Sequence, residues 1–132
     1  MSQPQRYENV TWNGVSLVDY KPGEKDRALE IISNHFIPAY KEAGVPVPHT
    51  IEFQTGPWDV LVISHIKDGP SMLTWETSPQ EVEIQKAMLE MADDQEEMQE
   101  IMDEYQSLVA RSTAHLGFSG RYGPPVSPDA SQ

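Results

Sequence analysis

The feature that most constrains the fold is an apolar run at residues 58–66 (WDVLVISHI), which has hydrophobic side chains on both faces of a strand. Val60 and Val62 share one face, because successive side chains of a strand alternate. Leu61 and Ile63 share the other. A strand that is apolar on both faces is buried on both faces, so this segment is predicted to be a central strand of a sheet.

Two further segments in the first half of the chain have strand patterns. Residues 10–20 are predicted to form one long strand with a local irregularity at Asn13-Gly14. The dipeptide Asn-Gly is also the strongest short hairpin signal, so a small separate hairpin is the alternative. Residues 49–55 alternate between apolar and polar side chains, and a Gly-Pro turn separates them from the central strand.

Residues 24–43 change to a helical period, with one apolar stripe: Ala28, Leu29, Ile32, Phe36, Ala39 and Tyr40. Gly44 is a good stop signal for this helix. Pro38 is predicted to kink the helix, because it cannot donate a hydrogen bond to the carbonyl of Asn34.

The second helical region begins at a capping box, Ser78-Pro79-Gln80-Glu81, with proline at the first helical position. This helix is expected to end near Ala92, and Asp93 or Asp94 is expected to start another. The predicted apolar sides of the two helices are Val82, Ile84, Met88 and Met91, then Met98, Ile101, Met102, Tyr105 and Leu108. Residues 111–118 are predicted to form the last strand.

The order strand, helix, strand, strand, broken helix, strand is that of a ferredoxin-like α+β fold. Such a βαββαβ subunit has one four-stranded antiparallel sheet with the helices on one face. A chain of 132 residues has room for one such domain, which we assign to residues 9–122. The polar segments 1–8 and 123–132 are expected to be flexible termini.

Composition excludes several classes of function. Nine Lys and Arg against 21 Asp and Glu give a formal net charge of −12, which argues against binding to nucleic acid or to anionic membranes. No apolar run approaches the roughly 18–20 residues of a membrane span, and the N-terminus has no signal-peptide pattern. We therefore expect a cytoplasmic protein. Without cysteines the chain has no thiol nucleophile and no thiolate metal site.

The four histidines, at positions 35, 49, 65 and 115, are dispersed along the chain. None forms the short helical spacing that zinc or iron sites use, so no metal site is predicted. Neither a Gly-x-Ser-x-Gly nucleophile elbow nor a glycine-rich phosphate loop is present, and no cofactor is predicted.

The chain resembles the dimeric α/β-barrel superfamily, in particular its NIPSNAP-like and antibiotic-biosynthesis-monooxygenase-like branch. The segments that carry the resemblance are 15–23 (VSLVDYKPG), 32–44 (ISNHFIPAYKEAG), 56–60 (GPWDV) and 105–113 (YQSLVARST). The resemblance implies a small-molecule-binding protein, either a cofactor-independent monooxygenase or an isomerase. A non-catalytic dimeric binding module is the first alternative, and a haem-binding or haem-degrading protein is the second. The Asn, Trp and His used by haem-degrading members have no matching positions here.

The predicted sheet also indicates how the protein assembles. Helices cover only one face of the sheet, so one apolar side of the central strand remains uncovered. Burial of each such side chain stabilises by about 1.5–3 kcal/mol. The sequence therefore predicts a homodimer that packs sheet against sheet.

A ligand is expected between the concave sheet and the helices, where the strands diverge. Tyr20, Trp58 and Trp75 are the candidate ligand-binding side chains, and their rings suit a small apolar or aromatic molecule. His65 is the first candidate for a catalytic proton transfer and His35 the second, because imidazole titrates near neutral pH.

Overall fold

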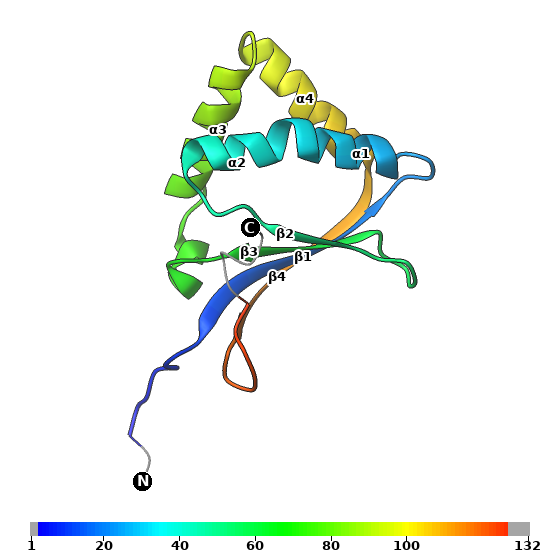
Figure 1. Ribbon diagram of the computed structural model, residues 1–132. Helices are drawn as coiled ribbons and strands as arrows, with labels where there is room; N and C mark the ends of the chain where they lie inside the picture. Colours follow the sequence, from blue (N-terminus) through cyan, green and yellow to red (C-terminus); the bar gives the residue numbers. More distant parts are fainter. Residues whose placement is uncertain (1–2, 127–132) are drawn as a thin grey trace.

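The computed structural model describes residues 3–126. In chain order the elements are β1 (Thr11–Tyr20), α1 (Lys25–Ile31), the π-helical turn η1 (Ile32–Phe36), α2 (Ile37–Ala43), β2 (His49–Glu52), β3 (Val60–His65), the 3₁₀-helix η2 (Gly69–Thr74), α3 (Pro79–Met91), α4 (Gln95–Leu108) and β4 (Val109–Ser119). The strands form one antiparallel sheet in the order β2-β3-β1-β4, with the helices on one face (Figure 1). The predicted ferredoxin-like subunit is confirmed, and so is the central position of β3.

The first strand, β1, runs through Asn13-Gly14 without a turn, so the hairpin alternative is wrong. The Asn13 side chain is buried, and its amide donates hydrogen bonds to the Thr11 carbonyl and the Ser119 hydroxyl, both at 3.1 Å. The bond to Ser119 fastens the strand to β4 at the dipeptide. The irregularity lies elsewhere, at Asp19/Tyr20, where the register against β4 shifts.

The predicted disturbance of the first helix at Pro38 takes the form of the π-helical turn η1. Ahead of Pro38, the backbone N–H of Ile37 donates to the Ile32 carbonyl, five residues back. A π-turn inserts one extra residue, so it rotates the helix faces relative to a regular helix. Ahead of this turn, on the regular helix α1, Ile31 is fully buried three residues after Ala28, whereas the sequence pattern placed Ile32, which is half-buried, on the buried stripe.

Both predicted helix starts in the second half are present. The Ser78 hydroxyl accepts a hydrogen bond from the Glu81 N–H at 3.1 Å, and the Asp94 carboxylate accepts one from the Glu97 N–H at 2.8 Å. The Glu97 carboxylate in turn accepts from the Asp93 N–H at 2.9 Å. These side-chain caps satisfy N–H groups that the first turn of a helix leaves unpaired.

The core has two parts. Between the sheet and the helices α1 and α4 lies a cluster formed by Val18, Tyr20, Ala28, Ile31, Val60 and Leu108. Between α2 and α3 lies a smaller one formed by Ala39, Ala87 and Met88. Val82 and Met91, predicted on the apolar side of α3, are 38% and 49% exposed. The prediction failed there because α3 packs on α2 through the small Ala87 rather than on the sheet.

The register separates the two faces of the sheet. Val18 and Val60 are paired and pack under the helices. Leu17 and Leu61 are paired on the opposite, helix-free face, where both are half-buried and Ile51 of β2 is 49% exposed. The uncovered apolar face that the sequence predicted is therefore the one that carries Leu61 and Ile63.

The last strand is two residues longer at its start than predicted and begins directly after α4. The predicted flexible termini lie partly outside the described residues, at 1–2 and 127–132. Within the described part, the Tyr7 ring lies 4.5 Å from that of Phe118, and the Val126 N–H donates to the Ser119 hydroxyl at 3.0 Å. The domain bounds 9–122 stay a prediction. In residues 3–126 no helix has the length and apolar character needed to cross a membrane.

Candidate ligand-binding site

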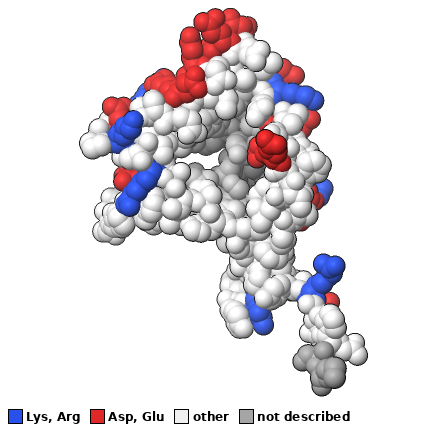
Figure 2. All heavy atoms as spheres, turned by 180° about the vertical axis from the view of Figure 1, so that it is seen from behind, with Lys and Arg blue, Asp and Glu red and all other residues white. Residues whose placement is uncertain are grey.

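A cleft of about 140 Å³ lies between the C-terminal end of α4 and the helix-covered face of β1 and β4. We call it the sheet cleft. Its lining combines small hydroxyl-bearing and apolar side chains with one amide and one phenol: Ser16, Val18, Tyr105, Gln106, Val109, Ser112, Thr113 and Ala114. Seen from behind, the molecule is hollowed between the layer of helices and the sheet (Figure 2).

Two features of the backbone place α4 over the cleft. The helix passes into β4 without a connecting loop, and the Lys21 N–H fastens this junction by donating to the Leu108 carbonyl at 2.8 Å. The register shift at Asp19/Tyr20 brings Val109 opposite Tyr20. An irregularity of this kind bends a strand locally and re-aims its side chains. The bend lies where α4 passes into β4, beside the cleft.

Tyr105, which borders the sheet cleft, pairs with Tyr20 of the core. The hydroxyl groups of Tyr20 and Tyr105 are hydrogen-bonded at 2.9 Å, and their rings meet edge to face at 6.0 Å. The Phe36 ring contacts Tyr105 in the same manner at 5.1 Å. Tyr20 is only 4% exposed and belongs to the core, whereas Tyr105 also borders the cleft.

Burial keeps both tyrosines protonated. It raises the pKa of Tyr20 far above its ordinary value, and the hydrogen bond with Tyr105 and the charge of Asp59 raise it further. The pKa of Tyr105 is also raised by burial, although the hydrogen bond from Tyr20 opposes this shift. At neutral pH the phenol that borders the cleft is therefore a neutral hydrogen-bonding group and not a base.

The lining determines what chemistry the sheet cleft supports. Its polar groups are three hydroxyls, one amide and the Tyr105 phenol, so no carboxylate, imidazole or ammonium of residues 3–126 borders it. Hydroxyl and amide groups donate and accept hydrogen bonds without changing charge. The arrangement suits the binding of an uncharged molecule, and it offers no group that exchanges a proton near neutral pH.

The structure places His65 far from this cleft. His65 pairs with Asn13 on the helix-free face of the sheet, where it borders a crevice too narrow for a water molecule, next to His49. Its Nδ1 atom is buried and has no hydrogen-bond partner among the described residues. Along β1, Asn13 is seven residues from Tyr20, or roughly 23 Å at about 3.3 Å per residue. Thus the single pocket expected to join His65 and Tyr20 is not formed.

His35 lies neither at the sheet cleft nor at the crevice beside His65. It borders a separate cleft between η1 and the junction of α3 with α4, and no residue of the sheet lines that cleft. The two predicted catalytic histidines are therefore not brought together. Their catalytic roles stay predictions.

The two predicted tryptophans also lie outside the lining of the sheet cleft. The Arg111 guanidinium stacks over the Trp58 ring at 4.3 Å, and it donates a hydrogen bond to the Pro57 carbonyl at 3.0 Å. Trp58 thus contacts a side chain of β4, two strands away from β3 in the sheet. Trp75 follows η2 and is 52% exposed.

Sequence reasoning missed most of the lining. Tyr105 was on the predicted apolar stripe of its helix, but its hydrogen bond to Tyr20, 85 positions away, could not be predicted from the sequence. Ser16 and Ser112 are small polar residues on strands, and only the register places both on the helix-covered face. Among the described residues, no group of three or more His, Cys, Asp or Glu side chains is arranged to hold a metal ion.

Fold and site together define a ferredoxin-like subunit with a neutral cleft between its sheet and its helices. No family model matches the chain, and no match was found among curated proteins. The chain is similar in structure to a NIPSNAP family protein of unknown function from Agrobacterium tumefaciens, with a TM-score of 0.59 and 15% identity over 91% of this chain and 97% of that one. A second NIPSNAP family protein from that organism gives 0.57 and 13%, over 92% and 96%.

A NIPSNAP-like domain protein from Burkholderia xenovorans is also similar, with a TM-score of 0.54 and 14% identity over 92% of this chain and 95% of that one. All three solved structures are covered almost completely, so the shared architecture extends over the whole subunit. The predicted resemblance to NIPSNAP-like proteins is confirmed at the level of the fold.

Proposed function

We propose that the protein binds a small, uncharged apolar or aromatic molecule in the sheet cleft. The observation that carries the proposal is the neutral lining, in which hydroxyl and amide groups alternate with apolar side chains. Binding sites of this class combine an apolar wall with a few polar groups that orient the ligand. The protonated Tyr105 phenol is the best-placed of these groups, because its hydrogen bond to Tyr20 fixes its position.

A cleft-filling substitution tests this proposal. Native mass spectrometry of gently purified protein, followed by ligand-observed NMR with neutral monocyclic compounds, measures binding to the natural sequence and to Ala114→Trp. Ala114 borders the cleft and is exposed, so the indole is expected to occupy the cleft without disturbing the core. Ala110→Trp is the matched control, because Ala110 is an exposed alanine of the same strand outside the lining. Equal binding by both variants would contradict the proposal.

The lining favours the non-catalytic binding module over the two enzymatic alternatives. A cofactor-independent monooxygenase or isomerase needs a group that removes a proton from its substrate, and a haem protein commonly uses a histidine as axial ligand. Neither kind of group borders the sheet cleft. Oxygen consumption with a bound ligand would support the monooxygenase, and a Soret band on addition of haem would support the haem protein.

We also propose that the protein is a homodimer joined through the helix-free face of the sheet. Leu17 and Leu61 pair at the centre of this face, and Ile51 is 49% exposed at its edge. The helices of residues 3–126 lie on the other side of the sheet (Figure 1). A two-fold contact brings the same apolar patch of a second copy against them, so each copy covers the other.

Light scattering on Leu61→Arg tests the dimer. The introduced charge would have to be buried in a sheet-to-sheet contact, so we expect the variant to be monomeric at micromolar concentration. Lys86→Glu is a control that changes charge on the exposed side of α3, and it should leave the mass unchanged. A monomeric natural protein would show that no such contact exists.

A further inference from the structure

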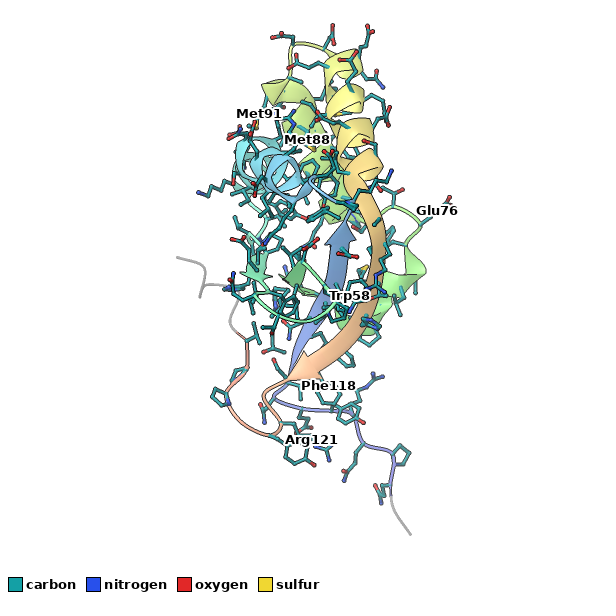
Figure 3. The ribbon with its side chains drawn as sticks, turned by 90° about the vertical axis from the view of Figure 1, so that its right-hand side faces the viewer. Trp58, Glu76, Met88, Met91, Phe118 and Arg121 are labelled. Carbon is teal, nitrogen blue, oxygen red and sulfur yellow. The ribbon has the colours of Figure 1, made fainter. Side chains whose placement is uncertain are left out.

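Another cleft in the described part of the chain lies among helices, at the junction of α3 with α4. We call it the methionine cleft. It has a volume of about 160 Å³ and is lined by apolar side chains from α3 and α4 together with three polar ones: Met88, Met91, Ala92, Met98 and Ile101, with Asn34, His35 and Glu97. Figure 3 shows Met88 and Met91 on α3, on the side where the helices of residues 25–43 pass.

The size of this cleft corresponds to one aromatic ring. A cavity of about 150 Å³ with apolar walls is large enough to hold benzene. Three of the lining side chains are thioethers, and sulfur contacts an aromatic ring favourably, by about 0.3–1.5 kcal/mol. Met91 is 49% exposed, so burial in the core does not account for its position at the cleft.

The π-helical turn supplies the polar wall. Asn34 and His35 both belong to η1, which replaces a regular helical turn ahead of Pro38. Such single π-turns occur frequently at functional sites, because they re-aim neighbouring side chains. Here the turn brings an amide and an imidazole against the methionines of α3 and α4. His35 is also close enough to Glu104 for its charge to lower the pKa of that carboxyl group, although Arg27 is the larger cause.

The acidic residues around the methionine cleft indicate the charge of the ligand. Between Lys86 and Arg111 the chain has eight acidic residues and neither Lys nor Arg. Glu97 borders the cleft itself, and Asp93 and Asp94 lie in the adjacent turn. Figure 2 shows the acidic side chains gathered at this apex of the molecule. A concentration of one sign of charge around a cleft attracts ligands of the opposite sign.

We propose that the methionine cleft is a second binding site, which takes a single aromatic ring bearing a protonated amine. The ring lies against the methionine side chains, and the ammonium group lies toward Glu97 and the acidic turn. His35 and Asn34 accept or donate the remaining hydrogen bonds of the amine side. This site is separate from the sheet cleft, whose lining contains neither a methionine nor a charged group.

Methyl NMR with methionine labelling tests the proposal directly. Benzylammonium is the probe; benzyl alcohol and benzoate have the same ring with no charge and with a negative charge. We expect benzylammonium to shift the methyl signals of Met88, Met91 and Met98, with a dissociation constant on the order of 1 mM for so small a ligand. Met72 of η2 lies outside the cleft and serves as the unshifted reference. Benzoate should leave all four signals in place.

The variant Glu97→Gln tests the role of charge. Glutamine keeps an oxygen that accepts the hydrogen bond from the Asp93 N–H, so the helix start is preserved. The loss of one nearby carboxylate should lower the affinity for benzylammonium about two- to fivefold. Glu83→Gln removes the same charge from an exposed position of α3 outside the lining, and it should not change the affinity.

Three results would overturn the proposal. One is an equal response of the three methionine signals to benzoate and to benzylammonium, and another is no response to benzylammonium at tens of millimolar. The third is a shift of the same signals when the protein alone is diluted, because a second copy of the chain would then be the occupant of the cleft. Since no methionine lines the sheet cleft, none of these results bears on the proposed function.

Discussion

The sheet cleft and the methionine cleft are similar in volume but are built in different ways. Residues far apart in the chain, such as Ser16 and Ala114, meet in the sheet cleft because the strand register pairs them. The methionine cleft instead depends on a π-turn and on the packing of three helices. One lining is neutral and the other is bordered by carboxylates. Under the two proposals, the first cleft takes an uncharged molecule and the second a cation.

The largest loss of stability is expected in the core cluster between the sheet and the helices α1 and α4. Ile31, at the end of α1, is fully buried in this cluster, so Ile31→Ala should lower the free energy of unfolding by about 2–5 kcal/mol. The neighbouring Ile32→Ala is the matched control, because Ile32 is half-buried and should cost clearly less. Urea denaturation measures both. A larger loss for Ile32→Ala would contradict the burial of Ile31 and favour the apolar stripe that the sequence predicted.

The two tyrosines compare the core with the border of the sheet cleft, because Tyr20 lies in the core and Tyr105 at the cleft. Tyr105→Phe leaves the Tyr20 hydroxyl buried without a partner, and this should cost about 1–3 kcal/mol. Tyr20→Phe leaves the hydroxyl of Tyr105 without this partner, and it should cost less because Tyr105 is only half-buried and borders the cleft. Equal losses in urea denaturation would mean that both hydroxyls are equally buried.

A smaller effect is expected at the start of α4, next to the methionine cleft. Asp94→Ala removes the acceptor of the Glu97 N–H and should lower stability by about 0.5–2 kcal/mol. The variant should also broaden the Met98 methyl signal while the sheet cleft is unaffected. Asp94→Asn, which retains an oxygen acceptor, should restore most of the stability. If it does not, the charge rather than the hydrogen bond is responsible.

The smallest effect is confined to alkaline solution. The folded-state pKa of Tyr20 is raised above its unfolded value near 10, so the stability that its protonated form contributes is complete below about pH 10. This contribution is lost as the pH rises toward the folded pKa, because only the unfolded chain releases the proton. Urea midpoints between pH 9 and pH 11 should therefore fall less steeply in Tyr20→Phe than in the natural sequence. Parallel curves would contradict this assignment.

Local patterns were sufficient for much of the fold. The two-faced run at 58–66 predicted the central strand, Ser78 and Asp94 predicted the helix starts, and Pro38 predicted a disturbance of the first helix. Each of these features depends on residues within a few positions of one another, and such short-range physics can be read from a sequence. The form of the disturbance, a π-turn, could not be read in this way, because it also depends on packing: α1 lies against α4, and α2 lies against α3.

The candidate sites depended on longer-range relations. His65 and Tyr20 were expected to share a pocket, but residue parity along β1 and β3 places them on opposite faces of the sheet. The sequence by itself determined the order of the elements, the negative charge and the existence of one uncovered apolar face, since these follow from composition and periodicity. Only the tertiary structure decided which face the helices cover and which side chains line each cleft. Those outcomes depend on strand register and helix packing, which join residues more than a hundred positions apart.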